Sequence, residues 1–378
     1  MLRMIGTKLV RLVPVLLLVS LGTFFMLELV PGDPALEVLG PDARPEQYVA
    51  VRHELGLDKP VVERYFEWMG DAVKGDFGTS LKPPVQKVGD AIKARLPVTL
   101  EITVLSMGMA LAVAIPLALA SAYRAGGRLD RSVNAVAFGA LSVPSFLAGL
   151  LVVFFLVFHV DIVRWLLLAA AVALAAGMVV RTVSVLRSYP SGRERTVYGV
   201  LKLLAVAVVV AIGVLLFTRF PNFPRQGFVR WTDERGKWAN LRSAFLPALT
   251  LATVEVAVFT RLLRADLITT LYEDFILAAK AKGMPAWRIL LRDALRPSSF
   301  SVITVAGVTL GRLVGGTAIV EAIFNLPGMG SLIITSIGGK DYKVVQGAVL
   351  VVAVFYVLIN VAVDIAYAYL DPRIRRRG

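Results

Sequence analysis

The chain has 378 residues, of which 57% are hydrophobic and only 18% are charged. A soluble domain carries about 25% charged residues, so this composition favours a protein that lies in lipid. The absence of cysteine excludes a disulfide scaffold, thiol catalysis and cysteine-ligated metal sites, and two histidines are too few for a multi-histidine site. The net charge of +14 would suggest nucleic acid in a soluble protein, but its distribution has to be considered first.

Eight stretches are apolar enough to cross a bilayer, which takes about 20 residues as a helix. They lie at about 9–30, 97–122, 133–158, 163–183, 199–219, 245–265, 299–320 and 344–370. The first run is longer than the core of a signal peptide and precedes no small-x-small cleavage site, so we expect it to remain as a membrane helix. The sequence therefore predicts an all-α, polytopic membrane protein with about eight spans.

The distribution of Lys and Arg predicts the orientation of these spans. With both termini in the cytoplasm, every short loop on the inner side is basic, and so is the tail at 373–378. The outer segment 219–245 is also rich in cations and departs from this rule. Most of the positive charge is thus a positive-inside bias, with membrane lipid as the expected partner of the tail and no nucleic acid.

Three segments outside the predicted spans are long enough to have structure of their own, and one of them, 184–198, is a short basic loop on the inner side. Residues 31–96 are polar and mixed in charge, and they predict a small external subdomain with a short helix around Pro60–Lys74. Residues 266–298 form the longest segment on the inner side. Within them, Tyr272–Lys282 favours a helix, and Gly283 can end that helix in a left-handed conformation.

The inner segment predicts a helix–turn–helix at the membrane surface. Phe275, Ala278, Ala279 and Lys282 recur at helical spacing, and Pro285 is suited to starting the second helix. Small side chains on such a helix let a partner's backbone approach closely. An amphipathic linker resting on lipid headgroups fits the same residues equally well.

The pattern Ala278-Ala279-x-x-x-Gly283, followed by Leu295 and Pro297, resembles the EAA loop of bacterial ABC importer permeases. More narrowly, the chain resembles the B-type permease of the dipeptide/oligopeptide (peptide/nickel) transporter family. The segments that carry this resemblance are 29–34, 55–60, 75–80, 95–101, 274–283, 321–330 and 341–347. They occur in the right order over nearly the whole chain except about 160–240.

In that family the loop is a coupling helix that docks in a groove of the ATPase subunit. The resemblance implies this role for Asp274, Phe275, Ala278, Ala279, Lys282, Gly283 and Arg288. The chain departs from the family motif at Leu277, which replaces a Glu, and at Asp293, where the subfamily often has His. These departures concern the fine geometry of docking.

The resemblance also implies the fold, an ABC importer type I transmembrane domain with a six-span core. Residues 160–225 look like an inserted pair of spans, which preserves the orientation of everything downstream. The expected organisation is a first helix at 1–30, an external subdomain at 31–96, spans two and three at 97–158, an inserted region at 159–244, core helices with the coupling loop 272–297 at 245–372, and a basic cytoplasmic tail at 373–378.

Ionisable residues within membrane spans are candidates for function. Arg312 lies in the seventh span and could pair with Glu255 or Asp364, either as a structural ion pair or along a translocation path. Gly307, Gly311 and Gly315 beside it form a small-residue face, which more often packs helices than binds a substrate.

A turn-rich segment follows the seventh span and lies near the external mouth in the resembled family. Its candidate gate residues are Glu321, Pro327, Gly328, Met329 and Asp341. Pro327-Gly328 favours a turn, and a tight re-entrant loop without ligand contacts is the alternative.

Neither a catalytic constellation nor a phosphate-binding loop is present in the sequence. The chain is therefore expected to bind no cofactor, with ATP and Mg held by partner subunits. The resemblance implies two ABC ATPase subunits or one fused tandem, a homologous second permease, and an extracytoplasmic binding protein that delivers di- or oligopeptides in a bacterial plasma membrane. A stand-alone ion-coupled transporter or channel is the alternative, suggested by Glu255, Arg312 and Asp364.

Overall fold

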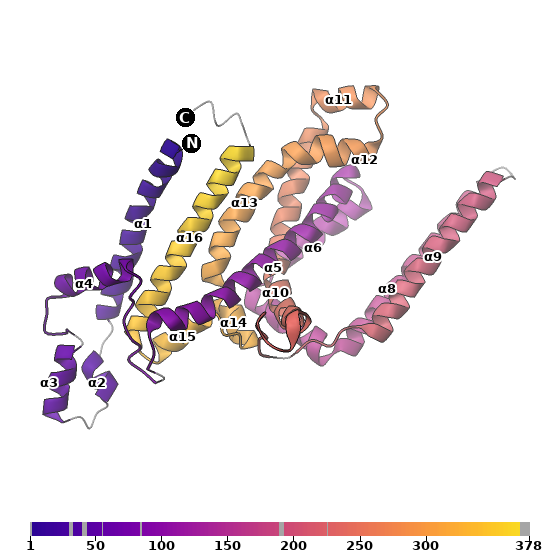
Figure 1. The fold of residues 1–378 in the computed structure, drawn as a ribbon. Coiled ribbons are helices and arrows are strands. Elements are labelled where there is room, and N and C mark those ends of the chain that lie inside the picture. Colours follow the sequence, from indigo (N-terminus) through magenta and orange to yellow (C-terminus); the bar gives the residue numbers. More distant parts are fainter. Residues whose placement is uncertain are drawn as a thin grey trace. The chain divides into compact units, whose positions relative to one another are not determined.

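The computed structural model describes residues 2–29, 33–39, 44–54, 56–83, 85–188, 193–224 and 226–370. In this part of the chain the regular structure is helical, apart from an isolated bridge between Thr79 and Lys87 (Figure 1). The contacts divide the chain into two compact units, one made of Met1–Gly149 with Gln226–Gly378 and the other of Leu150–Arg225.

The long helices of the first unit are α1 (Leu2–Glu28), α5 (Val88–Tyr123), α6 (Arg128–Ser142), α10 (Gly236–Leu271), α13 (Leu295–Gly316) and α16 (Tyr342–Leu370). Its short helices are α2 (Pro34–Leu39), α3 (Pro45–Glu54), α4 (Val61–Val73), α11 (Asp274–Ala281), α12 (Ala286–Arg288), α14 (Ala318–Phe324) and α15 (Met329–Gly338). α7 (Ser145–Val153) crosses the division, and α8 (Val160–Ser188) and α9 (Arg193–Arg219) belong to the second unit.

Among the described residues, six helices are long and apolar enough to cross a membrane, or up to eight if each of two bent helix pairs counts as one span. This confirms the prediction of an all-α, polytopic membrane protein. α4 confirms the short helix expected around Pro60–Lys74, with Pro60 at its N-cap. The basic tail at 373–378 lies outside the described residues.

The span predicted at 133–158 is broken, because α6 and the helix Ser145–Phe158 meet at an angle of 104°. Pro144 explains the break, since it lacks an N–H and its ring disfavours a helical conformation in the preceding residue. Val143 is accordingly extended, with φ −92° and ψ 119°. Hydropathy averages over such a break and does not detect it.

The predicted start of the second span at Pro97 is also wrong. α5 begins nine residues earlier, at Val88, and continues through Pro97 without interruption. Its first turns are polar on the outside but bury Val88, Ala91 and Ile92 against α15 and α16. Tertiary packing therefore extends the helix beyond its apolar segment.

α10 is the central helix of the first unit, where it packs against α5, α6 and α13. α16 packs between α13 and α1. Figure 1 shows that α1 begins and α16 ends at the same end of this unit, and that α11 and α12 lie at that end as well. The short helices α14 and α15 lie at the opposite end, together with the N-terminal subdomain α2–α4.

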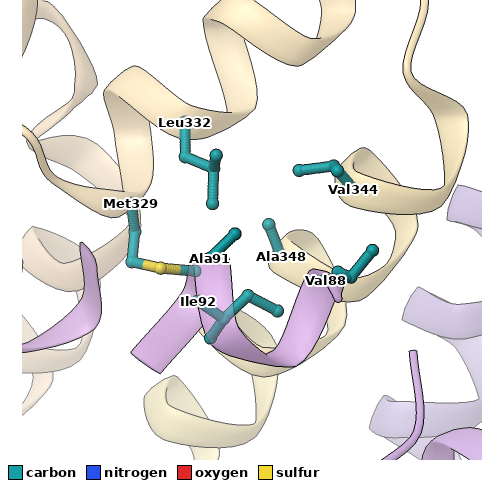
Figure 2. Packing of buried hydrophobic residues seen from close by; sticks show 7 residues of the cluster. All are labelled: Val88, Ala91, Ile92, Met329, Leu332, Val344 and Ala348. Carbon is teal, nitrogen blue, oxygen red and sulfur yellow. The ribbon is translucent and has the colours of Figure 1, made fainter. Parts of the chain in front are cut away.

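A hydrophobic cluster joins α5, α15 and α16 at that opposite end (Figure 2). Its members are Val88, Ala91, Ile92, Met329, Leu332, Val344 and Ala348. Gly347 allows this approach, because a Cβ there would lie 2.9 Å from Cγ1 of Val88 and 3.0 Å from Cβ of Phe77. The cluster fixes the start of α5 against α15 and α16, which lie far from it in the sequence.

The second unit contains an antiparallel pair of helices, α8 and α9. Small residues let α8 and α9 pack closely, since a Cβ at Gly213 would collide with Ala171. Trp165 and Phe217 stack edge to face at 4.8 Å between ring centroids. Most large apolar side chains of both helices are exposed, as expected for helices that face lipid.

Candidate functional site

The segment between α10 and α13 folds into a short surface helix followed by a tight turn. α11 ends in a Schellman motif, in which the N–H of Met284 donates to the carbonyl of Ala279 at 3.2 Å. Gly283 has φ +73°, a conformation that glycine adopts without strain. This confirms the left-handed helix end predicted for Gly283.

The second helix of the predicted helix–turn–helix is not separate. α12 begins at Ala286 with Pro285 at its N-cap, and a π-helical turn at Ile289–Ala294 (η2) carries it into α13. The helix is therefore continuous over Ala286–Gly316. Similarly, α10 extends to Leu271, beyond the predicted end of the span at 265. The loop itself is thus shorter than 266–298 and is held by a helix on each side.

α11 buries one side and exposes the other. Ile276 is fully buried and Ala279 is 9% exposed, so both pack inward against η2. The exposed side carries the predicted residues Asp274, Phe275, Ala278 and Lys282, and Gly283 and Arg288 are exposed as well. Of the two small residues expected to let a partner approach, Ala278 is exposed, whereas Ala279 is buried and supports the helix from beneath.

Large apolar side chains are exposed on this loop among cations. Tyr272 is 79% exposed, Trp287 is 66% exposed, and Phe275, Leu277 and Leu291 are also exposed. Lys280, Lys282, Arg288 and Arg292 are exposed around them. We call the surface formed by these nine side chains the loop surface. Its combination of aromatic anchors and positive charge is typical of a protein–protein contact.

An ion pair between a buried carboxylate and an exposed guanidinium lies within the spans. Nη2 of Arg312 donates to Oε1 of Glu255 at 2.7 Å, which joins α13 to α10. Of the two expected pairings of Arg312 this is the one observed, and the side chain of Asp364 lies outside the described residues. Glu255 is almost completely buried, whereas most of the Arg312 side chain is exposed.

The glycines near Arg312 pack α13 against α16, as the small-residue face predicts. A Cβ at Gly307 would collide with Val363, and one at Gly311 would lie 3.0 Å from the ring of Tyr356. Gly315 lies nearest to Val352. Because these glycines face α16, Arg312 extends from a different side of α13.

Of the candidate gate residues, Glu321, Gly328 and Met329 are buried in a polar network where α14 bends by 86° into α15. The carboxylate of Glu321 accepts hydrogen bonds from the hydroxyls of Thr99 and Thr317, at 2.7 and 2.8 Å, and from the N–H of Ser331 at 2.8 Å. The hydroxyl of Thr99 accepts from the N–H of Met329 at 2.8 Å. Glu321 is thus an anchor between α5, α14 and α15.

The turn itself needs a glycine at 328. A Cβ at Gly328 would overlap the carboxylate of Glu321, so the two residues form one packed unit. Asn325 turns the chain with φ +50°, Leu326 is buried, and Pro327 lies between Leu326 and Gly328. This arrangement is a tight re-entrant turn, and a gating role for these residues stays a prediction.

Asp341 lies at the corner between α15 and α16 and holds the segment that precedes α5. Its carboxylate accepts a hydrogen bond from the hydroxyl of Ser80 and one from the N–H of Leu81 at 3.3 Å. The methylene chain of Lys343 lies over Gly78. Two segments of the family resemblance, 75–80 and 341–347, are therefore in contact.

A polar cluster that sequence reasoning missed lies at the end of the unit where α5 passes into α6. Asp130 is 2% exposed and accepts from Nη2 of Arg264 at 2.7 Å, from the N–H of Gly126 at 2.8 Å and from the hydroxyl of Ser121. It links α5 and α6 to the last turns of α10, which lead into α11. In the sequence Asp130 is one acid in a basic loop, and only its place in the first turn of a helix distinguishes it.

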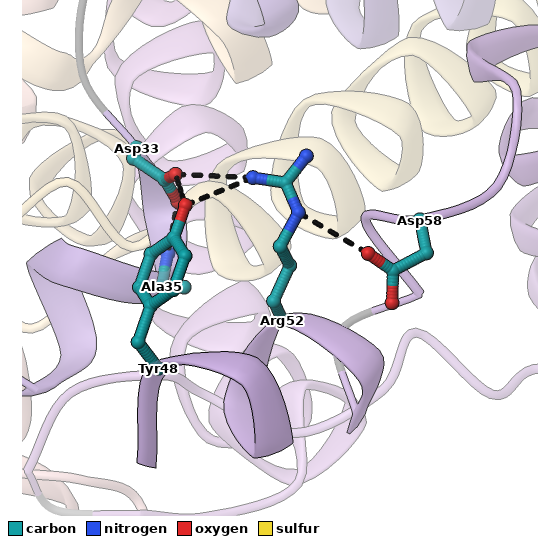
Figure 3. A network of polar contacts seen from close by, with 5 residues as sticks. All are labelled: Asp33, Ala35, Tyr48, Arg52 and Asp58. Atoms are coloured by element: carbon teal, nitrogen blue, oxygen red, sulfur yellow. Dashed lines mark hydrogen bonds and ion pairs between the residues drawn. The ribbon is translucent and has the colours of Figure 1, made fainter. Parts of the chain in front are cut away.

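The N-terminal subdomain has its own polar network (Figure 3). Tyr48 donates to Asp33, and Nη1 of Arg52 donates to Asp33 at 3.2 Å, while its Nε donates to Asp58 at 3.2 Å. The hydrogen bond from Tyr48, with lesser help from Arg52, lowers the pKa of Asp33 below its usual 3.8. The subdomain is also tied to α1, because Arg64 on α4 binds both oxygens of Glu28 at 2.8 Å.

Comparisons with known proteins agree with this architecture. Residues 194–376 match the family described as binding-protein-dependent transport system inner membrane component, and residues 1–103 match its N-terminal region. The chain is 31% identical to a putative peptide transport system permease protein of Brucella abortus over 97% of both chains. It is 30% identical to the di/tripeptide transport system permease protein of Pseudomonas aeruginosa over the whole of both chains, and 29% identical to the glutathione transport system permease protein of Escherichia coli over 99% of both. The chain therefore belongs to the family of binding-protein-dependent transport system inner membrane components.

Proposed function

We propose that this chain is the membrane subunit of an ATP-driven importer that takes up di- or oligopeptides from an extracytoplasmic binding protein. The observation that carries the proposal is the loop surface, in which exposed aromatic and basic side chains stand on a helix braced by α10 and α13. The names of the relatives, which refer to peptide, di/tripeptide and glutathione transport, support the substrate class.

The loop surface docks on an ATPase subunit and transmits its motion. Because α11 is joined rigidly to α10 and to the continuous helix Ala286–Gly316, movement of the loop tilts both helices. Two ATPase subunits, or one tandem, bind ATP and Mg, and a homologous second permease completes the path. This chain binds none of these cofactors and supplies one half of an alternating-access pathway.

The protein lies in the bacterial plasma membrane with both termini in the cytoplasm. The loop surface is at the same end of the first unit as the start of α1 and the end of α16. That end carries Arg128, Arg131, Arg288, Arg292 and Arg296, in agreement with the excess of cations on the cytoplasmic side.

Purification through a C-terminal tag in mild detergent, followed by mass spectrometry, tests the assembly. We expect to recover ATP-binding-cassette subunits and a second permease, and to see ATP-dependent uptake of a dipeptide after reconstitution with the binding protein. Recovery of this chain alone as a stable homo-oligomer, with uptake driven by an ion gradient, would contradict the proposal and support the stand-alone transporter.

A pair of variants tests the loop surface itself. Phe275→Ser with Trp287→Ser removes two exposed aromatic anchors and should release the ATPase subunits while the second permease is still recovered. The matched control is Phe66→Ser, which removes an exposed aromatic side chain from α4 and should leave the ATPase bound. Full retention of the ATPase by the double variant would show that docking uses another surface.

A further inference from the structure

One face of α13 is exposed and is unlike a lipid-facing helix. Ser301, Thr304, Val308 and Arg312 are exposed and follow one another at spacings of three and four residues. They therefore form a stripe along the helix, distinct from the side that packs on α16. The lipid-facing helices α8 and α9 expose mainly Leu, Val and Ile, whereas this stripe is polar, small and charged.

Arg312 lies within the span predicted at 299–320, and Glu255 lies within the span predicted at 245–265. Glu255, its partner, is 16 residues from the end of α10, which places it about 24 Å from that end along the helix. The Arg312 side chain is nevertheless 62% exposed, against 3% for Glu255. A guanidinium at this depth is strongly disfavoured against hydrocarbon, so the stripe must face water or protein.

The ion pair leaves bonding capacity on both sides. Glu255 accepts one hydrogen bond from Arg312, and its buried Oε2 has no partner among the described residues. The guanidinium carries five N–H donors, and within the described part of the chain Glu255 is its one acceptor. Glu255 thus fixes the guanidinium while most of its donors stay available to a ligand on the exposed stripe.

We propose that Arg312 binds the C-terminal carboxylate of a peptide in the translocation path, with Glu255 as the positioning residue. This inference rests on the proposed function. The planar guanidinium matches a carboxylate in a two-bond geometry. Every unmodified peptide carries this group whatever its sequence, so such a site recognises peptides as a class.

Glu255 also limits how tightly the carboxylate is held. Its negative charge lies against the same guanidinium, and this partial neutralisation weakens the attraction for a second anion. A transport site must bind its cargo strongly enough to admit it and weakly enough to release it. Removing the charge at Glu255 should therefore tighten binding and slow release, an effect that a purely structural role does not produce.

The absence of cysteine from the sequence makes a clean accessibility experiment possible. In the complete transporter, Val308→Cys places a thiol one turn from Arg312 on the exposed stripe, and Val302→Cys places one on the buried side of α13. A charged, membrane-impermeant thiosulfonate should modify the first and not the second. Dialanine should protect the Val308→Cys variant, and its C-terminal amide should protect it far less.

Second substitutions in the Val308→Cys background test the roles of both charges. With Arg312→Gln, the dialanine concentration for half protection should rise about tenfold or more, because a charge-assisted hydrogen bond is lost. Arg312→Lys keeps the positive charge and should restore part of the protection by dialanine. With Glu255→Gln, the dialanine concentration for half protection and the maximal uptake rate should both fall. The double substitution Arg312→Gln with Glu255→Gln removes both charges and controls for the burial of an unpaired Glu255.

The opposite results overturn the inference. If the Val308→Cys variant is unreactive in the complete transporter, the stripe is covered by the second permease and is no peptide path. Equal protection by dialanine and its amide would show that the carboxylate is not recognised. In both cases ATP-dependent uptake of dialanine by the parent transporter leaves the proposed function standing, and absence of that uptake refutes the function itself.

Discussion

The carboxylate of Glu321 joins three helices through hydrogen bonds that all come from neutral donors. Removing it leaves the hydroxyls of Thr99 and Thr317 and the N–H of Ser331 without their acceptor in a fully buried place. Sequence reasoning named Glu321 as a candidate gate residue. It could not predict the network, because Thr99 is 222 positions away in the chain and only the fold brings it near.

Glu321→Ala should destabilise the protein by about 3–5 kcal/mol, because several buried donors lose their acceptor together. Glu321→Gln keeps the shape and one acceptor oxygen and should have a smaller effect. The measurement is thermal unfolding in detergent, with the exposed Glu234→Ala as the control. If the Ala variant unfolds at the parent temperature, the network does not hold α14 and α15 in place.

The lowered pKa of Asp33 predicts that acid loosens the N-terminal subdomain. Because its pKa is lowered below 3.8 in the folded chain, the stabilisation by Asp33 is complete above about pH 4 and is lost as the pH falls through the lowered value. Tyr48→Phe removes the largest cause of the shift and should move this loss to higher pH. The rate of pepsin cleavage between residues 33 and 58, followed from about pH 4 to pH 2, measures this loss of stability. Tyr65→Phe, outside the network, is the control and should leave the profile unchanged.

Hydropathy located the long helices, because an apolar helix of sufficient length is a property of a local stretch of sequence. It misplaced the ends of α5 and α10 and missed the break at Pro144, since packing and backbone sterics decide those features. In the loop between α10 and α13, the left-handed turn at Gly283 could be predicted from the sequence. The inward position of Ala279 was not predictable, because it depends on how α11 packs on η2.

A substitution at Gly283 tests the role of the turn that follows α11. Gly283→Pro cannot adopt φ +73° and loses the N–H that donates to Lys280, so the end of α11 should rearrange. Transport coupled to ATP should be lost while insertion into the membrane is preserved. Gly316→Ala is a suitable control, since a Cβ at Gly316 meets nothing within 4 Å and its backbone is helical. Unchanged ATP-coupled uptake by Gly283→Pro would refute a coupling role for the turn.

At the level of the whole molecule, the first unit contains the ion pair, the Glu321 network and the loop surface. The pair of helices α8 and α9 belongs to a unit of its own, Leu150–Arg225. The expectation of an inserted region at 159–244 stays a prediction. If this region is an inserted pair of spans, deleting both spans leaves the direction of every later helix unchanged.

A variant that lacks residues 160–219 should therefore insert with its C-terminus on the same side as the parent and should still bind the ATPase. Protease digestion of a C-terminal tag in inside-out vesicles measures the orientation, and co-purification measures the assembly. A variant that lacks α9 alone, Arg193–Arg219, removes one span and should invert or fail to insert, which makes it the control. Loss of ATPase binding in the first variant would show that the pair of helices contributes to the core.

The continuity of the helix from Ala286 to Gly316 links two distant events. A rod of 31 residues is about 46 Å long, so a tilt of about 5° displaces one end by about 4 Å relative to the other. The loop surface lies at one end of this rod and Arg312 near the other. If docking of the ATPase and binding of a peptide both favour one tilt, the factor by which the peptide changes the affinity for the ATPase equals the factor by which the ATPase changes the affinity for the peptide. On the proposed function, peptide and ATPase would thus regulate each other's binding through a single helix, and the binding of each could be used to follow the binding of the other.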